Sequence, residues 1–329
     1  MRKAKKGLIA TFVVVLTGLG LLLGYLFRPL AHKPVPAGFT CLDLESGTFG
    51  PLPALSGRVY GVGLSYAGHI EETASEFTPG AAPPLFIKAA GSIRIGGGEV
   101  AVPGSEQILA ALDSLEPGLE AEITSRHDRM PAMLDYEAEL ALVLLEDIEG
   151  EALEQETFAP RLGFTVINDL SARSLAILGE GRENQFDYWG LSKSFDGFSP
   201  LGERMWTPSA HAADAIPCVT IQTTVNGELR QRGSTADMIY TPADMLRFIA
   251  TAYPQARLKR GDVIATGTPG GVVMSTPRHL VRAANLLGVD RFTKLSMVID
   301  REGFLGPGDV VVTTAEGLAS VTVKLTTSD

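Results

Sequence analysis

The chain of 329 residues contains few cysteines and histidines, which narrows its chemistry. Two cysteines, Cys41 and Cys218, are too few for a disulfide scaffold or a zinc cluster. One disulfide and two free thiols remain equally open. The sequence also lacks a Gly-x-Ser-x-Gly motif, which argues against a serine hydrolase.

Positive charge is also scarce. Lysine and arginine total 28 against 38 acidic residues, giving a net charge of -10. No basic stripe crosses the part expected to fold, so the composition argues against nucleic acid as a partner. The length suits one large domain or two small ones, with ample material for a core.

One long hydrophobic run is present, at the N-terminus. Four basic residues within positions 1–6 precede an uncharged stretch over residues 7–27, which as a helix would extend about 30 Å. This pattern predicts a single transmembrane anchor, with the N-terminus cytosolic and the rest extracytoplasmic, periplasmic in a bacterium. A cleaved signal peptide is the alternative, although the apolar stretch is longer than such peptides usually carry.

The predicted organisation has four parts. Residues 1–6 form a basic cytosolic N-terminus, 7–27 the anchor, 28–57 a tether with an irregular lead-in, and 58–329 one folded domain. Turn-forming pairs separate short β-type runs in that domain. The runs cover residues 59–64, 85–87, 140–145, 163–167, 218–225, 263–265, 310–314 and 321–325. Helical patterning is confined to residues 243–252 and part of 276–287, so we expect a mostly β fold with some α.

Two carboxylates interrupt an apolar strand. Side chains alternate along a strand, so Glu137 and Glu139 point to the same side, about 7 Å apart. The rest of that side is apolar, so two carboxylates there would repel each other and lose hydration without a cation. A divalent metal is the simplest cation that would compensate them.

A third carboxylate, Asp169, follows another apolar run. The Asn-Asp pair there could instead only cap a helix. With Glu137 and Glu139, however, it completes a set of hard oxygen ligands. Such a set suits Mg²⁺, Mn²⁺ or Ca²⁺ rather than zinc.

Three other positions carry candidate chemistry. His69 and Glu72 would share one face of a helical turn, where the carboxylate could orient the imidazole as a general base; a solvated surface histidine is the alternative. Lys193, among aromatic and small residues, could face an anionic substrate or lie along an apolar surface. The Gly-Thr-Pro turn at Thr268 offers N–H groups and hydroxyls to an anion, or is only structural.

Taken in order, these segments resemble the C-terminal catalytic domain of the fumarylacetoacetate hydrolase family, over residues 59–325. That family includes acylpyruvate hydrolases and related hydratases and decarboxylases. The motifs carrying the resemblance are Gly63-Leu64-Ser65-Tyr66 with His69 and Glu72, Leu85-Phe86-Ile87-Lys88, Tyr136-Glu137-Ala138-Glu139-Leu140, Asn168-Asp169-Leu170-Ser171-Ala172-Arg173, Lys193-Ser194-Phe195-Asp196, Val225-Asn226-Gly227-Glu228, Gly261-Asp262-Val263-Ile264, Thr266-Gly267-Thr268-Pro269 and Gly308-Asp309-Val310-Val311.

The resemblance implies a fold and a set of roles. The fold would be a mixed β-roll, usually in a homodimer. The implied metal ligands are Glu137, Glu139 and Asp169, for a divalent ion that is Mg²⁺ before Mn²⁺ or Ca²⁺. The implied catalytic residues are His69, Glu72 and Lys193, and the implied substrate contacts are Thr268, Arg173 and Tyr66.

By resemblance, the activity is hydrolysis of a carbon–carbon bond in a β-diketo or 2-oxo acid. A hydratase or decarboxylase on the same metal, and an inactive membrane-tethered scaffold, are the alternatives. Ser174 and Ala176 stand where many members carry Asp and Gln. Residues 106–129 and 276–303 are longer than usual, and residues 179–188 are a candidate mobile lid.

Overall fold

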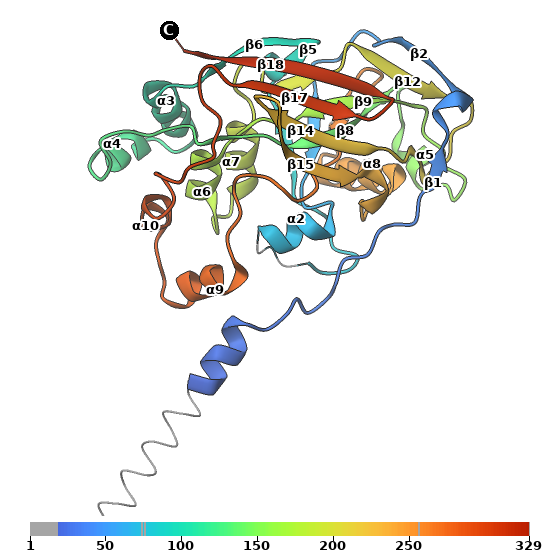
Figure 1. Cartoon of the computed structure of the whole chain (residues 1–329). Coiled ribbons are helices and arrows are strands. Elements are labelled where there is room, and N and C mark those ends of the chain that lie inside the picture. Colours follow the sequence, from blue (N-terminus) through green and yellow to red (C-terminus); the bar gives the residue numbers. More distant parts are fainter. Residues whose placement is uncertain (1–18, 74, 76, 256, 329) are drawn as a thin grey trace, which may run out of the picture.

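The structure is a computed structural model that describes residues 19–73, 75, 77–255 and 257–328. Two large sheets lie at its centre, with helices grouped around them (Figure 1). The nine-stranded sheet has the order β2-β12-β9-β8-β16-β3-β4, and β11 joins β5 to β9. Its strands are β2 (Gly47–Pro51), β12 (Arg204–Pro208), β9 (Leu162–Asn168), β8 (Ala138–Leu144), β16 (Val263–Ala265), β3 (Val59–Val62), β4 (Leu85–Lys88), β11 (Ser199–Leu201) and β5 (Ile93–Ile95).

The second sheet has five strands in the order β15-β14-β17-β18-β6. They are β15 (Glu228–Ser234), β14 (Thr220–Val225), β17 (Val310–Ala315), β18 (Ala319–Thr327) and β6 (Gly97–Val102). Two short pairs complete the strands: β1 (Thr40–Leu42) with β13 (Ala215–Pro217), and β7 (Leu134–Asp135) with β10 (Ser171–Ala172). Burial alternates along β18, so only one face of the second sheet faces the core there, whereas β8 and β9 are buried at every residue.

Helices are more numerous than the sequence predicted. The α-helices with described bounds are α2 (Ala67–Glu72), α3 (Ser105–Leu115), α4 (Leu119–Thr124), α5 (Gly150–Leu153), α6 (Arg173–Gly179), α7 (Gln185–Ser192), α8 (Pro242–Ala252), α9 (Arg278–Leu286) and α10 (Arg291–Ser296). Three 3₁₀ turns are η1 (Leu44–Ser46), η2 (Ala90–Ser92) and η3 (Thr235–Asp237). The fold is therefore mixed α/β, and the prediction of a mostly β chain is wrong. Most of the missed helices are short, and tertiary packing rather than a long apolar stripe stabilises such helices.

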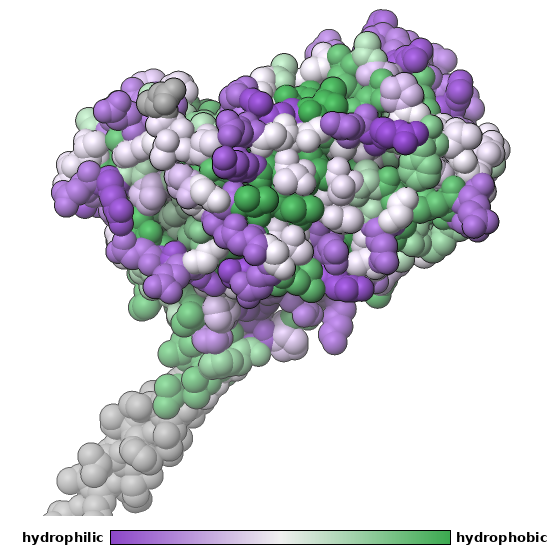
Figure 2. Space-filling model, turned by 45° about the horizontal axis from the view of Figure 1, so that its top comes forward, coloured by the Kyte–Doolittle hydropathy of each residue, from purple (hydrophilic) through white to green (hydrophobic). Residues whose placement is uncertain are grey.

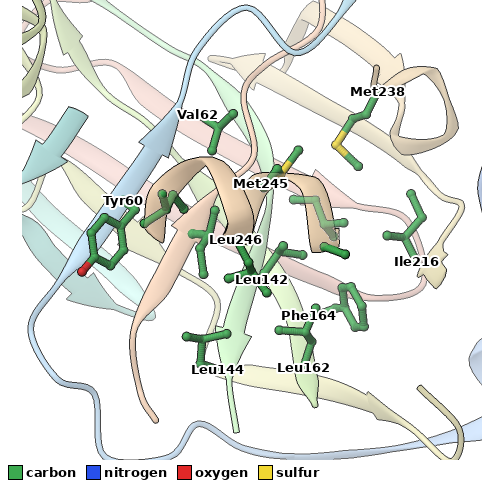
Figure 3. Close-up of a cluster of buried hydrophobic side chains, with 14 of the residues drawn as sticks. Tyr60, Val62, Leu142, Leu144, Leu162, Phe164, Ile216, Met238, Met245 and Leu246 are labelled. Atoms are coloured by element: carbon green, nitrogen blue, oxygen red, sulfur yellow. The ribbon is translucent and has the colours of Figure 1, made fainter. Parts of the chain in front are cut away.

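The main core lies between the nine-stranded sheet and α8 (Figure 3). Helix α8 begins where Thr241 caps it, in a reciprocal pair with Asp244, and Pro242 occupies its first turn. Its buried face carries Met245 and Leu246 against the strands. This packing fixes β8 and β9 side by side.

The N-terminal segment differs from its prediction. Residues 1–6 and residues 7–18 of the predicted span lie outside the described residues. In the part of the chain that the structure describes, no helix has both the length and the apolar character needed to cross a membrane. That finding contradicts the predicted transmembrane helix, and with it the predicted single-pass localisation and membrane partner.

The described helical residues 19–26 end against α9. Arg282 donates to the carbonyl of Arg28, with longer bonds to those of Tyr25 and Leu26, and Phe27 stacks on the His279 ring at 4.9 Å between centroids. Figure 2 shows apolar side chains of this helix standing out from the body of the molecule.

The two cysteines form a disulfide. Cys41 in β1 pairs with Cys218 next to β13, across 177 residues of sequence. The bond joins the lead-in segment to the main body, and it settles the alternative that the sequence left open.

Candidate metal centre

The three predicted carboxylates converge where β8 begins and β9 ends. The strands are antiparallel, with Glu139 opposite Ile167, so the start of one meets the end of the other. The N–H of Asp169 donates to the carbonyl of Glu137 at 2.8 Å. All three carboxylates are buried, and one oxygen from each lies within 4.8 Å of the others. Strand alternation indicated Glu137 and Glu139, and the pairing of β8 with β9 adds Asp169.

Three cations surround these carboxylates. Lys193 donates from Nζ to Glu137 at 2.7 Å and to Asp169 at 2.7 Å, and Lys88 donates to Asp169 at 2.5 Å. Arg173 pairs with Glu137 at 2.5 Å. Lys88 and Lys193 are almost completely buried. Sequence reasoning named Lys193 and Arg173 but assigned no role to Lys88.

The third hydrogen bond of Lys193 goes to the hydroxyl of Ser171 at 2.6 Å. An ammonium group has three N–H donors, so all of them are engaged. The pKa of Lys193 is raised because Asp169 and Glu137 together outweigh the effect of burial, so this group stays charged. A substrate oxygen could contact Lys193 only by replacing one present partner, and Ser171 is the uncharged one.

The carboxylates differ in their protonation. Burial opposes ionisation of Glu137, but Arg173 and Lys193 outweigh it and hold its pKa at about 2. Burial, reinforced by Asp169 and Glu137, raises the pKa of Glu139 well above its usual range. The N–H of Gly267 donates to Glu139 at 2.7 Å. Glu139 is therefore the carboxylate most in need of a further cation.

This donor set fits a hard divalent ion. The three carboxylates supply oxygen only, and burial together with the negative charge of Asp169 and Glu137 raises the pKa of Glu139. Mg²⁺, Mn²⁺ and Ca²⁺ prefer such ligands, whereas zinc prefers nitrogen and sulfur.

The predicted general base, His69, and its carboxylate partner, Glu72, lie on α2. His69 is buried, and its Nδ1 is 3.6 Å from the nearer carboxylate oxygen of Glu72. The N–H of Gly271 donates to both oxygens of Glu72, at 3.1 and 3.0 Å, which fixes that carboxylate. Gly267 in the same turn donates to Glu139, so the turn over residues 267–271 contacts both α2 and the carboxylate cluster.

Thr268 lies at the base of the cluster. Its hydroxyl donates to the carbonyl of Ala138 at 3.0 Å and accepts from Nε2 of Gln231 at 2.6 Å. Gln231 in turn accepts from the N–H of Ala138 at 2.9 Å, which ties the second sheet to the start of β8. Sequence reasoning missed Gln231, and the polar run of β15 contained no signal that this side chain is buried.

Tyr66 and Arg173 occupy different surroundings. Tyr66 is buried, and burial together with Glu139 raises the pKa of its phenol well above its usual range. Within the described residues its hydroxyl has no hydrogen-bond partner. Arg173 instead pairs with Asp135, whose Oδ2 accepts from its Nε at 2.9 Å.

The altered positions after Arg173 lie on α6. Ser174 is buried and donates to the carbonyl of Ala132 at 3.2 Å, and Ala176 follows on the same helix. Ser174 thus stabilises the backbone next to β7 instead of reaching the carboxylates.

Comparison with known sequences places the chain among related proteins. The family described as Fumarylacetoacetate (FAA) hydrolase C-terminal matches residues 58–326. Oxaloacetate tautomerase YisK of Bacillus subtilis is 29% identical over 241 residues, which cover 73% of this chain and 67% of that protein. A 4-hydroxyphenylacetate degradation bifunctional isomerase/decarboxylase of Salmonella dublin is 32% identical over 248 residues, 74% of this chain but only 47% of that protein.

A solved structure has the same fold. The fumarylpyruvate hydrolase of Pseudomonas aeruginosa, in complex with Mn²⁺ and pyruvate, aligns with a TM-score of 0.51 and 21% identity. The alignment covers 92% of this chain and 99% of that chain.

Proposed function

Because the chain belongs to the fumarylacetoacetate hydrolase family, we propose that it is a divalent-metal-dependent hydrolase of a carbon–carbon bond in an acylpyruvate-like 2-oxo acid. One observation carries the proposal. Three buried carboxylates share a 4.8 Å cluster, and the turn over residues 267–271 binds both Glu139 of that cluster and Glu72 beside His69.

Glu137, Glu139 and Asp169 would hold the metal, with Mg²⁺ as the first candidate. The Mn²⁺ and pyruvate in the fumarylpyruvate hydrolase structure support a divalent ion and a 2-oxo acid. Such an ion, when bound, supplies Lewis-acid polarisation of a substrate carbonyl.

The charge around the centre favours an anionic substrate. The carboxylates of Glu137, Glu139, Asp169 and Asp135 face three cations, which leaves a net charge of -1 when all are ionised. A divalent ion would change that charge to +1. The single carboxylate of a 2-oxo acid would neutralise it, and burial would strengthen this attraction.

The proposed proton transfers start at His69. Its Nδ1 faces Glu72, so Nε2 would take a proton from water, and the water oxygen would bond to the acyl carbonyl carbon. Lys193 would exchange its bond to Ser171 for one to the resulting oxyanion. The carbon–carbon bond then breaks, and the enolate that leaves takes the proton back from His69 to form the 2-oxo acid. Tyr66, Thr268 and Arg173 are proposed to orient the substrate.

Tautomerisation of a 2-oxo acid is the second candidate. The matched tautomerase supports it, and so does the His69–Glu72 pair, because moving one proton on carbon needs a base but no water. Decarboxylation or hydration on the same metal, as in the family at large, would likewise use the carboxylate cluster.

An assay of acylpyruvate with and without Mg²⁺ or Mn²⁺ tests the proposal. We expect metal-dependent release of pyruvate and a carboxylic acid, and a rate at least about 1000-fold lower in Glu139→Gln. Glu156→Gln, an exposed carboxylate on another loop, is the matched control and should retain the rate. Keto–enol conversion of the substrate without cleavage would contradict hydrolysis and favour the tautomerase activity. If neither wild type nor any variant is active with either metal, only a binding role would remain.

A further inference from the structure

The carboxylate cluster and the His69–Glu72 pair lie on separate elements. The cluster is built on β8 and β9 with their flanking residues, and His69 and Glu72 lie on α2. The segment of residues 271–278, between the Gly-Thr-Pro turn and α9, contacts both parts. In Figure 1, α2 and α9 lie on the same side of the sheets.

The middle of this segment is fixed to the carboxylate side, whereas its first residue, Gly271, binds Glu72 on α2. Asp135 is completely buried, and its two oxygens accept from the N–H groups of Val273 and Met274, each at 3.0 Å. The same carboxylate pairs with Arg173, which reaches Glu137. A chain of ionic and hydrogen-bonded contacts therefore runs from the cluster into the 271–278 segment.

The last residues of the segment, Thr276 and Arg278, are also fixed to α2. The N–H of Thr276 donates to the carbonyl of Glu72 at 3.2 Å. Arg278 donates from its two terminal nitrogens to the carbonyls of Ser75 at 2.9 Å and Ile70 at 3.2 Å. The guanidinium therefore bridges the last turn of α2 and the residues after it.

Helix α2 depends on such contacts. It has six residues, too few for a helix to be stable alone, and the carbonyls of its last turn accept from residues beyond its end, including Thr73 and Ser75. A cation at a helix C-terminus also interacts favourably with the helix dipole. Arg278 supplies both the donors and the charge.

We propose that the 271–278 segment sets the position of His69 and Glu72 relative to the carboxylate cluster, and that Arg278 is the positioning residue at its far end. The Arg278 side chain binds backbone carbonyls of Ser75 and Ile70, and it would therefore act on His69 and Glu72 through the backbone of α2. The catalytic part of this proposal rests on the proposed function, whereas the positional part does not.

Two variants of Arg278 and one control test the proposal. Arg278→Ala removes the guanidinium and with it the bonds to Ser75 and Ile70. Arg278→Lys keeps the charge with a single point of contact, and Arg247→Ala removes a similar arginine-to-carbonyl bond, to Leu153, away from α2. For each protein, hydrogen exchange is measured at the amides of Ile70 and Thr73, which donate to the carbonyls of Tyr66 and His69 across the two ends of α2. Mn²⁺ affinity, kcat and KM are measured in the same samples.

We expect Arg278→Ala to accelerate exchange at both amides and to lower kcat by about 10- to 100-fold, with KM and Mn²⁺ affinity near wild type. Arg278→Lys should recover part of both effects, and Arg247→Ala should show neither. Unchanged exchange and kcat in Arg278→Ala would overturn the proposal, and so would an equal loss of Mn²⁺ affinity, which indicates general unfolding. If the wild type turns over no 2-oxo acid, the proposed function fails, while the exchange data still decide whether Arg278 holds α2.

Discussion

Lys88 is a buried cation whose role depends on a single carboxylate. It donates to Asp169 and to the carbonyl of Phe198, at 2.5 and 2.8 Å. Burial lowers its pKa, and Asp169 offsets part of that change. The pair is therefore stable only while both members are present, because an isolated charge in such a site is costly.

Replacement of Lys88 by methionine should reveal this dependence. We expect Lys88→Met to lower the free energy of unfolding by about 3–5 kcal/mol without metal, because Asp169 is left without this partner. Added Mg²⁺ should restore part of the loss, because Asp169 binds the ion more tightly once Lys88 no longer competes for its carboxylate, and tighter binding stabilises the folded variant more than wild type. Urea unfolding with and without Mg²⁺ measures both. Equal losses in the two conditions would contradict a metal at Asp169.

Single residues show which parts of the site could be predicted. Glu137 and Glu139 stood out because they interrupt an apolar strand, and strand alternation brings them together. Lys88 also ends an apolar strand, but its partner Asp169 is 81 residues away, and no local pattern pairs them. Gln231 belongs to an otherwise polar strand, so its burial depends entirely on sheet packing.

Helices α6 and α7 form a hairpin whose first and last residues both lie at the site. Arg173 begins α6, and Lys193 follows α7. At the far end of the hairpin, Tyr188 donates to Glu116, and Arg291 binds both oxygens of Glu116 at 2.9 Å. The two long segments of the sequence therefore meet at the hairpin, and residues 179–188, predicted as a mobile lid, are attached there.

The Glu116 contacts should make stability depend on pH. Hydrogen bonds from Arg291 lower the pKa of Glu116 from 4.5 to about 2. A depressed folded-state pKa gives stabilisation that is fully present above about pH 4.5 and is lost as pH falls towards about 2. Glu116→Gln should therefore have a lower melting temperature than wild type at neutral pH, with the difference shrinking through that window. Glu156→Gln serves as the exposed control, and a constant difference across pH would contradict this role.

The sequence predicted strands better than helices. Each predicted β run appears in the structure, because alternation and turn pairs are local signals. Helix α3 buries Ile108, Leu109 and Leu112, a helical spacing that was present but lay in a segment regarded only as long. Helices α6 and α7 are seven and eight residues long, and contacts with distant segments, through Leu178 of α6 and Tyr188 of α7, stabilise them.

At the scale of the whole molecule, the net charge of the chain is negative, whereas cations gather at the site. The chain carries a net charge of -10, yet Lys88, Lys193 and Arg173 gather at the carboxylates. The family could be predicted from ordered motifs. The pairing of Cys41 with Cys218 could not, because 177 residues separate them. The homodimer implied by the family resemblance stays a prediction.

The most direct test of the central claim is a Mn²⁺ titration of metal-free protein, with acylpyruvate cleavage measured at each step. We predict that one Mn²⁺ binds per chain, that the cleavage rate rises in proportion to site occupancy, and that Glu139→Gln loses both. Cleavage that is independent of Mn²⁺, or tight binding unchanged in Glu139→Gln, would contradict a metal-dependent enzyme built on Glu137, Glu139 and Asp169.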